Sequence, residues 1–183
     1  MPLIIYTILL RLAAPLLWAY MFVRARGAGS TWQIFSAERF GFYALPWDGE
    51  APVWVHAVSV GETRAAQTLI AQLLARGERV LLTHMTATGR AEGARLFAAE
   101  IAAGQLRQQW IPYDFPGATQ KLFQHYRPRL GILIEREVWP NLIEQAQLAV
   151  VPIVLASARF SEKSQKQVKQ IDQVFISLMR ETY

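Results

Sequence analysis

The chain has 183 residues, of which 52% are hydrophobic and 18% are charged, with a formal net charge of +5. This balance excludes a disordered chain, which combines low hydrophobicity with high charge. The absence of cysteine excludes a disulfide framework, a cysteine nucleophile, a cysteine-based zinc site and an iron–sulfur cluster. The sequence contains no dense basic stripe interleaved with aromatic residues, so we expect no nucleic-acid partner.

The chain begins with an apolar run over residues 3–23 that contains one charge, Arg11. As a helix, this run is long enough to span a bilayer. Arg24 and Arg26 follow it directly, and the positive-inside rule then places the rest of the chain in the cytoplasm. Because an arginine at the bilayer centre costs about 2.5–3.5 kcal/mol on insertion scales, a helix lying in the membrane interface is an alternative. A buried core helix is another. We expect residues 1–28 to form a membrane anchor or an interfacial helix.

From residue 52 onwards, predicted strands and helices alternate. Strands are expected at 53–58, 80–83, 110–111, 130–134 and 151–155. Helices are expected at 63–76, 89–103, 116–126, 139–147 and 161–179, and a shorter helix at 32–40 precedes them. Such alternation implies βαβ units. The predicted fold of residues 29–183 is therefore α/β, with a Rossmann-like parallel sheet that carries helices on both faces.

Polar residues follow each predicted strand, where ligands gather in an open parallel sheet. Ser59 and Glu62 follow the first strand, and Glu135 follows an apolar strand directly. A carboxylate in that position is costly to bury without a partner. Glu62 lies at the start of a predicted helix, which favours its ionised form, so it is a candidate general base. A simple helix-capping acid is the alternative interpretation.

Other motifs are less specific. Arg64, Arg90 and Arg159 suit phosphate or carboxylate groups, although surface arginines exposed to solvent are the alternative. The sequence has no glycine-rich dinucleotide motif and no Walker loop, and its three histidines lack metal-ligand spacing, so no metal site is expected. Residues 57–61 resemble a nucleophile elbow around Ser59, which leaves a serine hydrolase as an alternative.

Six segments resemble, in order, the motifs of 3-deoxy-D-manno-octulosonic acid (Kdo) transferases. They are 38–41 (ERFG), 56–62 (HAVSVGE), 85–89 (MTATG), 112–116 (PYDFP), 135–141 (EREVWPN) and 158–164 (ARFSEKS). The resemblance implies an inverting glycosyltransferase of lipopolysaccharide synthesis that moves Kdo from CMP-Kdo to the lipid A precursor and needs no metal or other cofactor. It also implies a location on the cytoplasmic face of the Gram-negative inner membrane.

The resemblance further implies one half of a GT-B fold, in which the N-terminal domain receives the acceptor. Glu62 matches the family's catalytic base, and Glu135 matches a second essential acid that supports the transition state. Further residues of the matching segments or close to them are expected near substrate: Ser59, Gly61, Arg64, Thr86, Thr88, Gly89, Glu137, Asn141 and Arg159. Because the chain stops at Tyr183, we expect the C-terminal donor-binding domain to be absent and this half to be inactive alone. A non-catalytic lipid-binding module remains an alternative.

Overall fold

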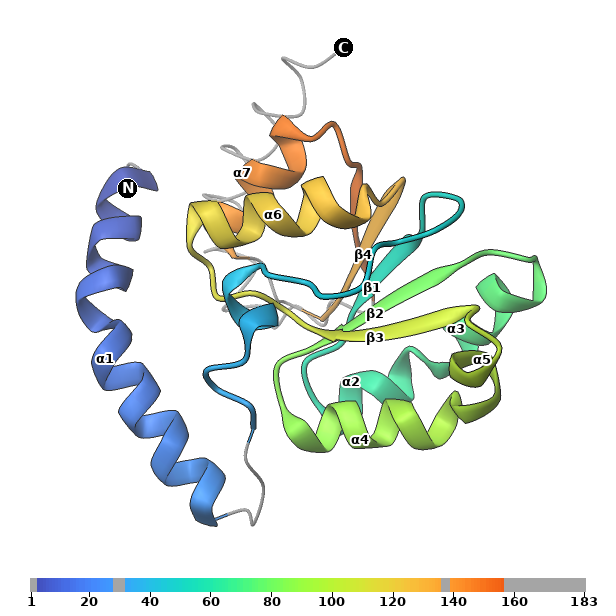
Figure 1. Ribbon diagram of the computed structural model, residues 1–183, viewed down its shortest axis with the longest axis horizontal. Helices are drawn as coiled ribbons and strands as arrows, with labels where there is room; N and C mark the ends of the chain where they lie inside the picture. The colour runs from blue at the N-terminus through green and yellow to red at the C-terminus, as the bar shows by residue number, and fades with distance from the viewer. Residues whose placement is uncertain (1–2, 28–31, 136–138, 157–183) are drawn as a thin grey trace, which may run out of the picture.

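The centre of the molecule is an all-parallel sheet, seen in a computed structural model that describes residues 3–27, 32–135 and 139–156. The sheet has five strands in the order β3-β2-β1-β4-β5. They are β1 (Val53–His56), β2 (Val80–His84), β3 (Leu106–Trp110), β4 (Leu130–Ile134) and β5 (Ile153–Ala156). This arrangement confirms the predicted α/β fold with a Rossmann-like parallel sheet (Figure 1).

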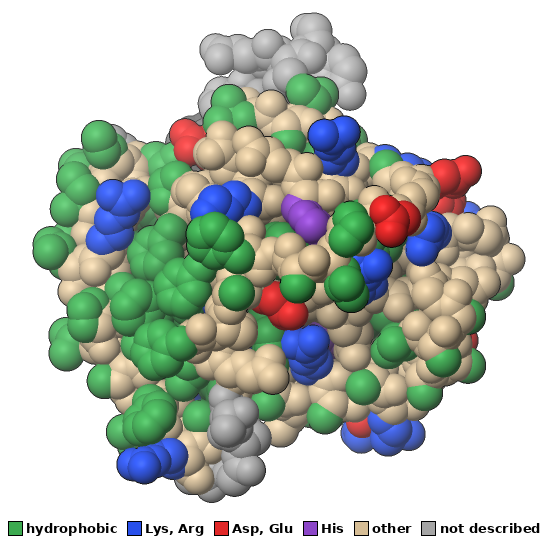
Figure 2. All heavy atoms as spheres, in the orientation of Figure 1, with side chains coloured by type: hydrophobic (Ala, Val, Ile, Leu, Met, Phe, Trp, Pro, Cys, Tyr) green, Lys and Arg blue, Asp and Glu red, His purple; other side chains and the backbone are tan. Residues whose placement is uncertain are grey.

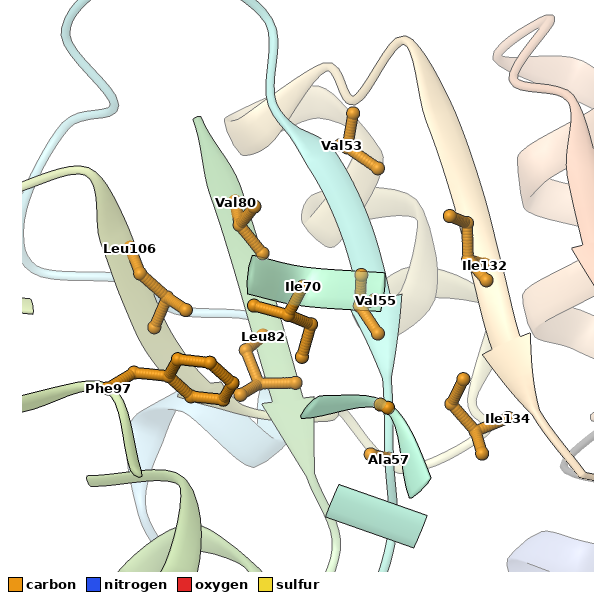
Figure 3. Packing of buried hydrophobic residues seen from close by; sticks show 11 residues of the cluster. Val53, Val55, Ala57, Ile70, Val80, Leu82, Phe97, Leu106, Ile132 and Ile134 are labelled. Atoms are coloured by element: carbon orange, nitrogen blue, oxygen red, sulfur yellow. The ribbon is translucent and has the colours of Figure 1, made fainter. Parts of the chain in front are cut away.

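Helices cover both faces of the sheet. One face carries α2 (Val60–Ala65), α3 (Gln67–Ala75), α4 (Ala87–Leu96) and α5 (Ala98–Ala102), and the other carries α6 (Pro116–Tyr126) and α7 (Pro140–Leu148). Strand side chains alternate between the two layers: Val53 and Val55 point into the first and Trp54 into the second. Figure 3 shows the first layer, where Ile70 packs over the strands. Burial on both faces explains why the three central strands, β1, β2 and β4, are almost continuous apolar runs.

Two predicted helices are each divided in the structure. The helix predicted at 63–76 begins earlier, at Val60, because Ser59 caps α2, and it is interrupted at Ala66. The helix predicted at 89–103 also begins earlier, behind the cap residue Thr86. It breaks at Phe97, whose side chain is buried in the first apolar layer. Both starts are local capping effects, since a side-chain oxygen satisfies backbone N–H groups of the first turn.

Two other predicted elements have wrong bounds. The strand predicted at 110–111 is β3, which begins at Leu106. Its middle residues are polar and half-buried because β3 is an edge strand, and this removed the apolar signal. Of the short helix predicted at 32–40, only the 3-10 turn η1 (Ala37–Phe40) forms. The helix predicted at 161–179 lies outside the described residues.

The apolar N-terminal run forms α1 (Leu3–Gly27), a single helix that lies along the domain (Figure 1). Tyr6 and Thr7, near its start, form hydrogen bonds with the domain. Trp18 packs against four aromatic rings outside α1, those of Phe35, Phe40, Tyr113 and Phe115. By length and composition α1 could cross a membrane, and only 11% of its most apolar stretch is buried. Hydrophobic side chains gather over α1 and beside it, on the left of Figure 2.

Candidate active site

The candidate site lies at the carboxyl edge of the sheet, where the strand order reverses. The chain runs outward from β1 through β2 to β3 and then returns to the other side of β1 as β4. Ligands of open α/β sheets bind at such a switch point, because the loops after the two central strands diverge there. Glu62 follows β1 and Glu135 follows β4. The two acidic candidates therefore come from the two loops that flank the switch point.

Glu62 is held by the turn that begins α2. Its Oε2 accepts a hydrogen bond from the Val58 backbone N–H (2.7 Å), and its Oε1 accepts one from the Ser59 hydroxyl (2.8 Å). Ser59 is the N-cap of α2, and its Oγ accepts from the Glu62 backbone N–H (3.4 Å). This reciprocal pattern is a variant of the capping box. The capping interpretation of Glu62 is thus observed, and the same contacts fix the orientation of its carboxylate, in a residue that is 7% exposed.

The loop after β2 is locked onto the loop after β1. Thr86 caps α4: its Oγ1 accepts from the Gly89 N–H (3.1 Å) and donates to the Val58 carbonyl (2.8 Å). The Thr86 backbone N–H also donates to the Val58 carbonyl (3.1 Å). A Cβ on Gly89 would lie 2.8 Å from that carbonyl oxygen. Two of the segments that carry the resemblance therefore form one interlocked unit that requires glycine at position 89.

We expect Gly89→Ala to destabilise the domain by roughly 1–3 kcal/mol, because the added methyl must push the two loops apart. Gly117→Ala, in α6, is a matched control, since a Cβ there meets nothing within 4 Å. That control should be neutral or stabilising by up to about 1 kcal/mol. Urea unfolding of both variants measures the difference. Equal stability of the two variants would contradict the close approach at Gly89.

Glu135 stands at the end of β4 in an unusual backbone conformation. Its φ is +62°, in the left-handed region that residues other than glycine rarely adopt. Its N–H donates to the Ala156 carbonyl of β5 (2.9 Å), and its side chain is exposed. A strained backbone position of this kind persists only where the surrounding structure maintains it, and such positions cluster at ligand sites. Glu137 and Arg159 lie outside the described residues.

Asn141 belongs to a buried polar cluster that also contains Tyr6, Thr7 and Asp114. The Asp114 carboxylate accepts hydrogen bonds from the backbone N–H groups of Asn141 (3.1 Å) and Leu142 (2.7 Å) and from the Tyr6 hydroxyl (2.8 Å). Asp114 thereby caps α7 from a distant loop, since Trp139, the local N-cap residue, makes no side-chain cap bond. Asn141 is fully buried, and its side chain forms hydrogen bonds inside this cluster.

The charge of Asp114 follows from its surroundings. Burial raises the pKa of Asp114 to about 6, while hydrogen bonds from Tyr6, Asn141 and Leu142 oppose the rise by stabilising the charged form. The carboxylate is therefore charged at neutral pH, beside the positive end of α7. Sequence reasoning noted the PYDFP segment but assigned Asp114 no role. The only available signal was a single acid in an otherwise apolar segment.

Two of the three predicted arginines, Arg64 and Arg90, are engaged with other side chains. The Arg64 Nε donates to Glu92 (2.7 Å), and the same carboxylate pairs with Arg95 (2.9 Å). Arg90 stacks on Trp110 and lies 3.4 Å from Glu38. Gly61 and Thr88 are exposed. Their predicted contacts with substrate, and that of Arg64, stay predictions.

A buried arginine, Arg39, joins the loop after β2 to the segment before β1. Its guanidinium donates to the backbone carbonyls of Trp32 (3.0 Å), Gln33 (3.2 Å) and Met85 (2.9 Å). It also lies 4.3 Å from the centroid of the Trp110 ring. Burial lowers the pKa of Arg39 to about 10, which leaves it charged at neutral pH. Sequence reasoning missed this role, although a charge among aromatic residues was the available signal.

His56 and His84 are the last residues of β1 and β2, and both are neutral at neutral pH. The His56 Nδ1 lies 2.9 Å from the Thr83 hydroxyl, and the His84 Nδ1 lies 2.9 Å from the Ala57 carbonyl. Burial lowers the pKa of His56 to about 3 and that of His84 to about 4. Over residues 3–27, 32–135 and 139–156, no three acidic or histidine side chains form a group able to hold a metal ion.

Ser59 is not set up as the nucleophile of a hydrolase. Its hydroxyl donates to Glu62, while His56 and His84 bond other residues and His125 lies 2.9 Å from the Leu45 carbonyl. The serine of a nucleophile-elbow hydrolase needs a histidine within hydrogen-bond reach. The observed contacts of Ser59 are those of a helix cap.

This fold and edge define a class of protein. A parallel sheet of this order, with acidic loops at its switch point and an apolar N-terminal helix, is the architecture of the N-terminal half of a GT-B glycosyltransferase. A family model described as "3-Deoxy-D-manno-octulosonic-acid transferase (kdotransferase)" matches residues 36–182. The chain belongs to this family of glycosyltransferases.

Individual relatives agree. A 3-deoxy-D-manno-octulosonic acid transferase of Bordetella pertussis is 56% identical over 171 residues, which cover 92% of this chain and 40% of the relative. A protein of the same name from Haemophilus influenzae is 34% identical over 70% of this chain and 30% of its own length. A probable mitochondrial one from Arabidopsis thaliana is 33% identical over 70% of this chain and 28% of its own length. The chain spans at most 40% of these relatives.

Proposed function

We propose that this chain is the acceptor-binding half of an inverting Kdo transferase, with Glu62 as general base. Glu62 takes the proton of an acceptor hydroxyl while that oxygen forms a bond to the anomeric carbon of Kdo. The bond from that carbon to the phosphate of CMP-Kdo breaks, and CMP leaves with the electron pair. The observation that carries the proposal is the carboxylate of Glu62, oriented by the Val58 N–H and the Ser59 hydroxyl beside the switch point.

Glu135 is the second acid of the proposal. Its exposed side chain starts from a left-handed backbone position at the end of β4, on the other side of the switch point from Glu62. We assign it to supporting the charge that develops in the transition state. The remaining predicted residues are proposed to line the acceptor site, except Gly89 and Asn141, which are buried in the domain.

The donor, CMP-Kdo, is proposed to bind a second domain in the complete transferase. The relatives are more than twice as long as the region matched here, which leaves room for such a domain. A general base accelerates transfer only when donor and acceptor are held within reach of it. We therefore propose that this half alone binds acceptor without turnover.

The acceptor is proposed to be the lipid A precursor at the cytoplasmic face of the bacterial inner membrane. Of the two predicted arrangements of α1, its contacts favour a helix lying in the interface. Tyr6 and Thr7 bond the domain near one end, and Ala25 is buried near the other. A spanning helix would withdraw Tyr6 and Thr7, and the buried Asn141 Oδ1 would then lose its donor Thr7 at a cost of about 1–3 kcal/mol.

Lipid binding tests the proposal. The 183-residue chain in detergent should bind a bisphosphorylated lipid A precursor saturably, followed by tryptophan fluorescence, and binding should weaken at least tenfold when the phosphates are removed. Binding that ignores the phosphates would favour the general lipid-binding module instead. No binding by a chain shown to be folded would contradict the proposed acceptor site.

A further inference from the structure

An apolar cavity of about 310 Å³ lies between α1 and the domain. Its α1 wall includes Ala14 and Trp18, and its domain wall includes Met85, Tyr113 and Phe115. Its volume lies at the lower end of the range of small-molecule sites, about 300–1,000 Å³. Among its lining residues, the Tyr6 hydroxyl and the Asp114 carboxylate bond one another, and the Tyr113 hydroxyl bonds the Ile34 carbonyl. The lining therefore suits an apolar ligand.

The walls of this cavity are held by specific contacts. Arg39 donates to the Met85 carbonyl (2.9 Å), and the Tyr113 hydroxyl donates to the Ile34 carbonyl (2.8 Å). On the α1 side, the hydrogen bond from Tyr6 lies toward one end, and the Trp18 ring lies 5.8 Å from that of Tyr113. Contacts on both walls therefore keep the space open, and a ligand would find it already formed.

The position of the cavity connects the candidate active site with the apolar surface of α1. Met85 directly precedes Thr86, whose hydroxyl bonds the loop that carries Glu62. On the other side, Leu17 and Tyr20 line the cavity and are also exposed, 45% and 60% respectively. The cavity is thus continuous with the hydrophobic face that covers α1 (Figure 2).

We infer that this cavity holds one acyl chain of the acceptor glycolipid while its sugar hydroxyl faces Glu62. This inference rests on the proposed function and adds a site for the apolar part of the substrate. An acyl chain enters from the membrane side and ends under the loops at the strand ends.

A photoreactive acceptor tests the inference with the 183-residue chain in mixed micelles. The probe is a bisphosphorylated, acylated glucosamine disaccharide with a diazirine midway along one acyl chain. Peptide mapping should find label on Met85, Tyr113 or Phe115. Ala14→Phe fills the cavity from α1, where Ala14 is 4% exposed, and should reduce this labelling at least tenfold. Leu12→Phe, on the outer side at 72% exposure, is the control and should leave it unchanged.

A competition arm works without any variant. Unlabelled glycolipid should suppress labelling of the cavity at least tenfold more effectively than a phospholipid with chains of the same length. Equal competition would overturn the assignment to the acceptor, and so would label confined to the outer face of α1. If phosphate-dependent glycolipid binding persists in either case, the proposed function stands and only the cavity assignment fails.

Discussion

Replacing Glu62 with glutamine, in a complete transferase that contains this half, is expected to lower turnover by about 10²–10⁴-fold, the usual contribution of a general base. Glutamine has nearly the same shape: its amide oxygen can accept from the Val58 N–H and its NH₂ group can donate to the Ser59 hydroxyl oxygen, but it cannot take a proton. The binding constant of the lipid acceptor should change little, so the loss should appear in kcat.

The control for this experiment is Glu78→Gln. Glu78 lies just before β2, at the opposite edge of the sheet, and pairs with Arg129. A surface pair of this kind contributes at most about 1 kcal/mol, and turnover of this variant should stay close to that of the parent enzyme. Similar turnover in the two variants would contradict the role of Glu62. A large fall in the melting temperature of Glu62→Gln alone would show that the capping role dominates.

Asp114→Ala is expected to lower the free energy of unfolding by about 3 kcal/mol. The change leaves three donors without an acceptor, namely the N–H groups of Asn141 and Leu142 and the Tyr6 hydroxyl. A buried donor left unpaired costs about 1–3 kcal/mol, and part of this loss is recovered when α1 or water relaxes into the gap. Urea unfolding at pH 7.5, where Asp114 is charged, measures the effect.

Two companion variants show where the loss arises. Tyr6→Phe removes only the bond between α1 and Asp114 and should cost about 1 kcal/mol. Asp48→Ala changes an exposed acid and should change stability by less than about 0.5 kcal/mol. An effect of Asp114→Ala as small as that of Asp48→Ala would contradict the capping of α7 by Asp114.

Much of the fold could be predicted because its signals are local. The helix at 116–126 and the strand at 130–134 were predicted with the observed bounds, since proline begins the helix and the strand is purely apolar. Gly77 was expected just after a helix, and it adopts the left-handed conformation (φ +82°) at the end of α3. In each case the residues that decide the structure are neighbours in the chain.

The predictions failed where distant contacts override local pattern. In β3, polar residues pair with β2 through the backbone, and backbone pairing leaves no mark on side-chain periodicity. The break at Phe97 places its ring in the apolar layer shared with Leu82 and Leu106. Sequence periodicity cannot show which residue of a long helical segment the core will accept.

The sequence by itself determined the α/β class, the apolar N-terminal helix and the acidic residues that follow the strands, because these depend on periodicity and on residues next to one another. The tertiary structure alone decided which of those residues meet. It set the strand order that brings the loops of Glu62 and Glu135 to one switch point. It also brought the Asp114 carboxylate to the N-terminus of α7 and the Tyr6 hydroxyl to that carboxylate. Residues 6 and 114 are 108 positions apart, and only packing of the whole chain brings such partners together.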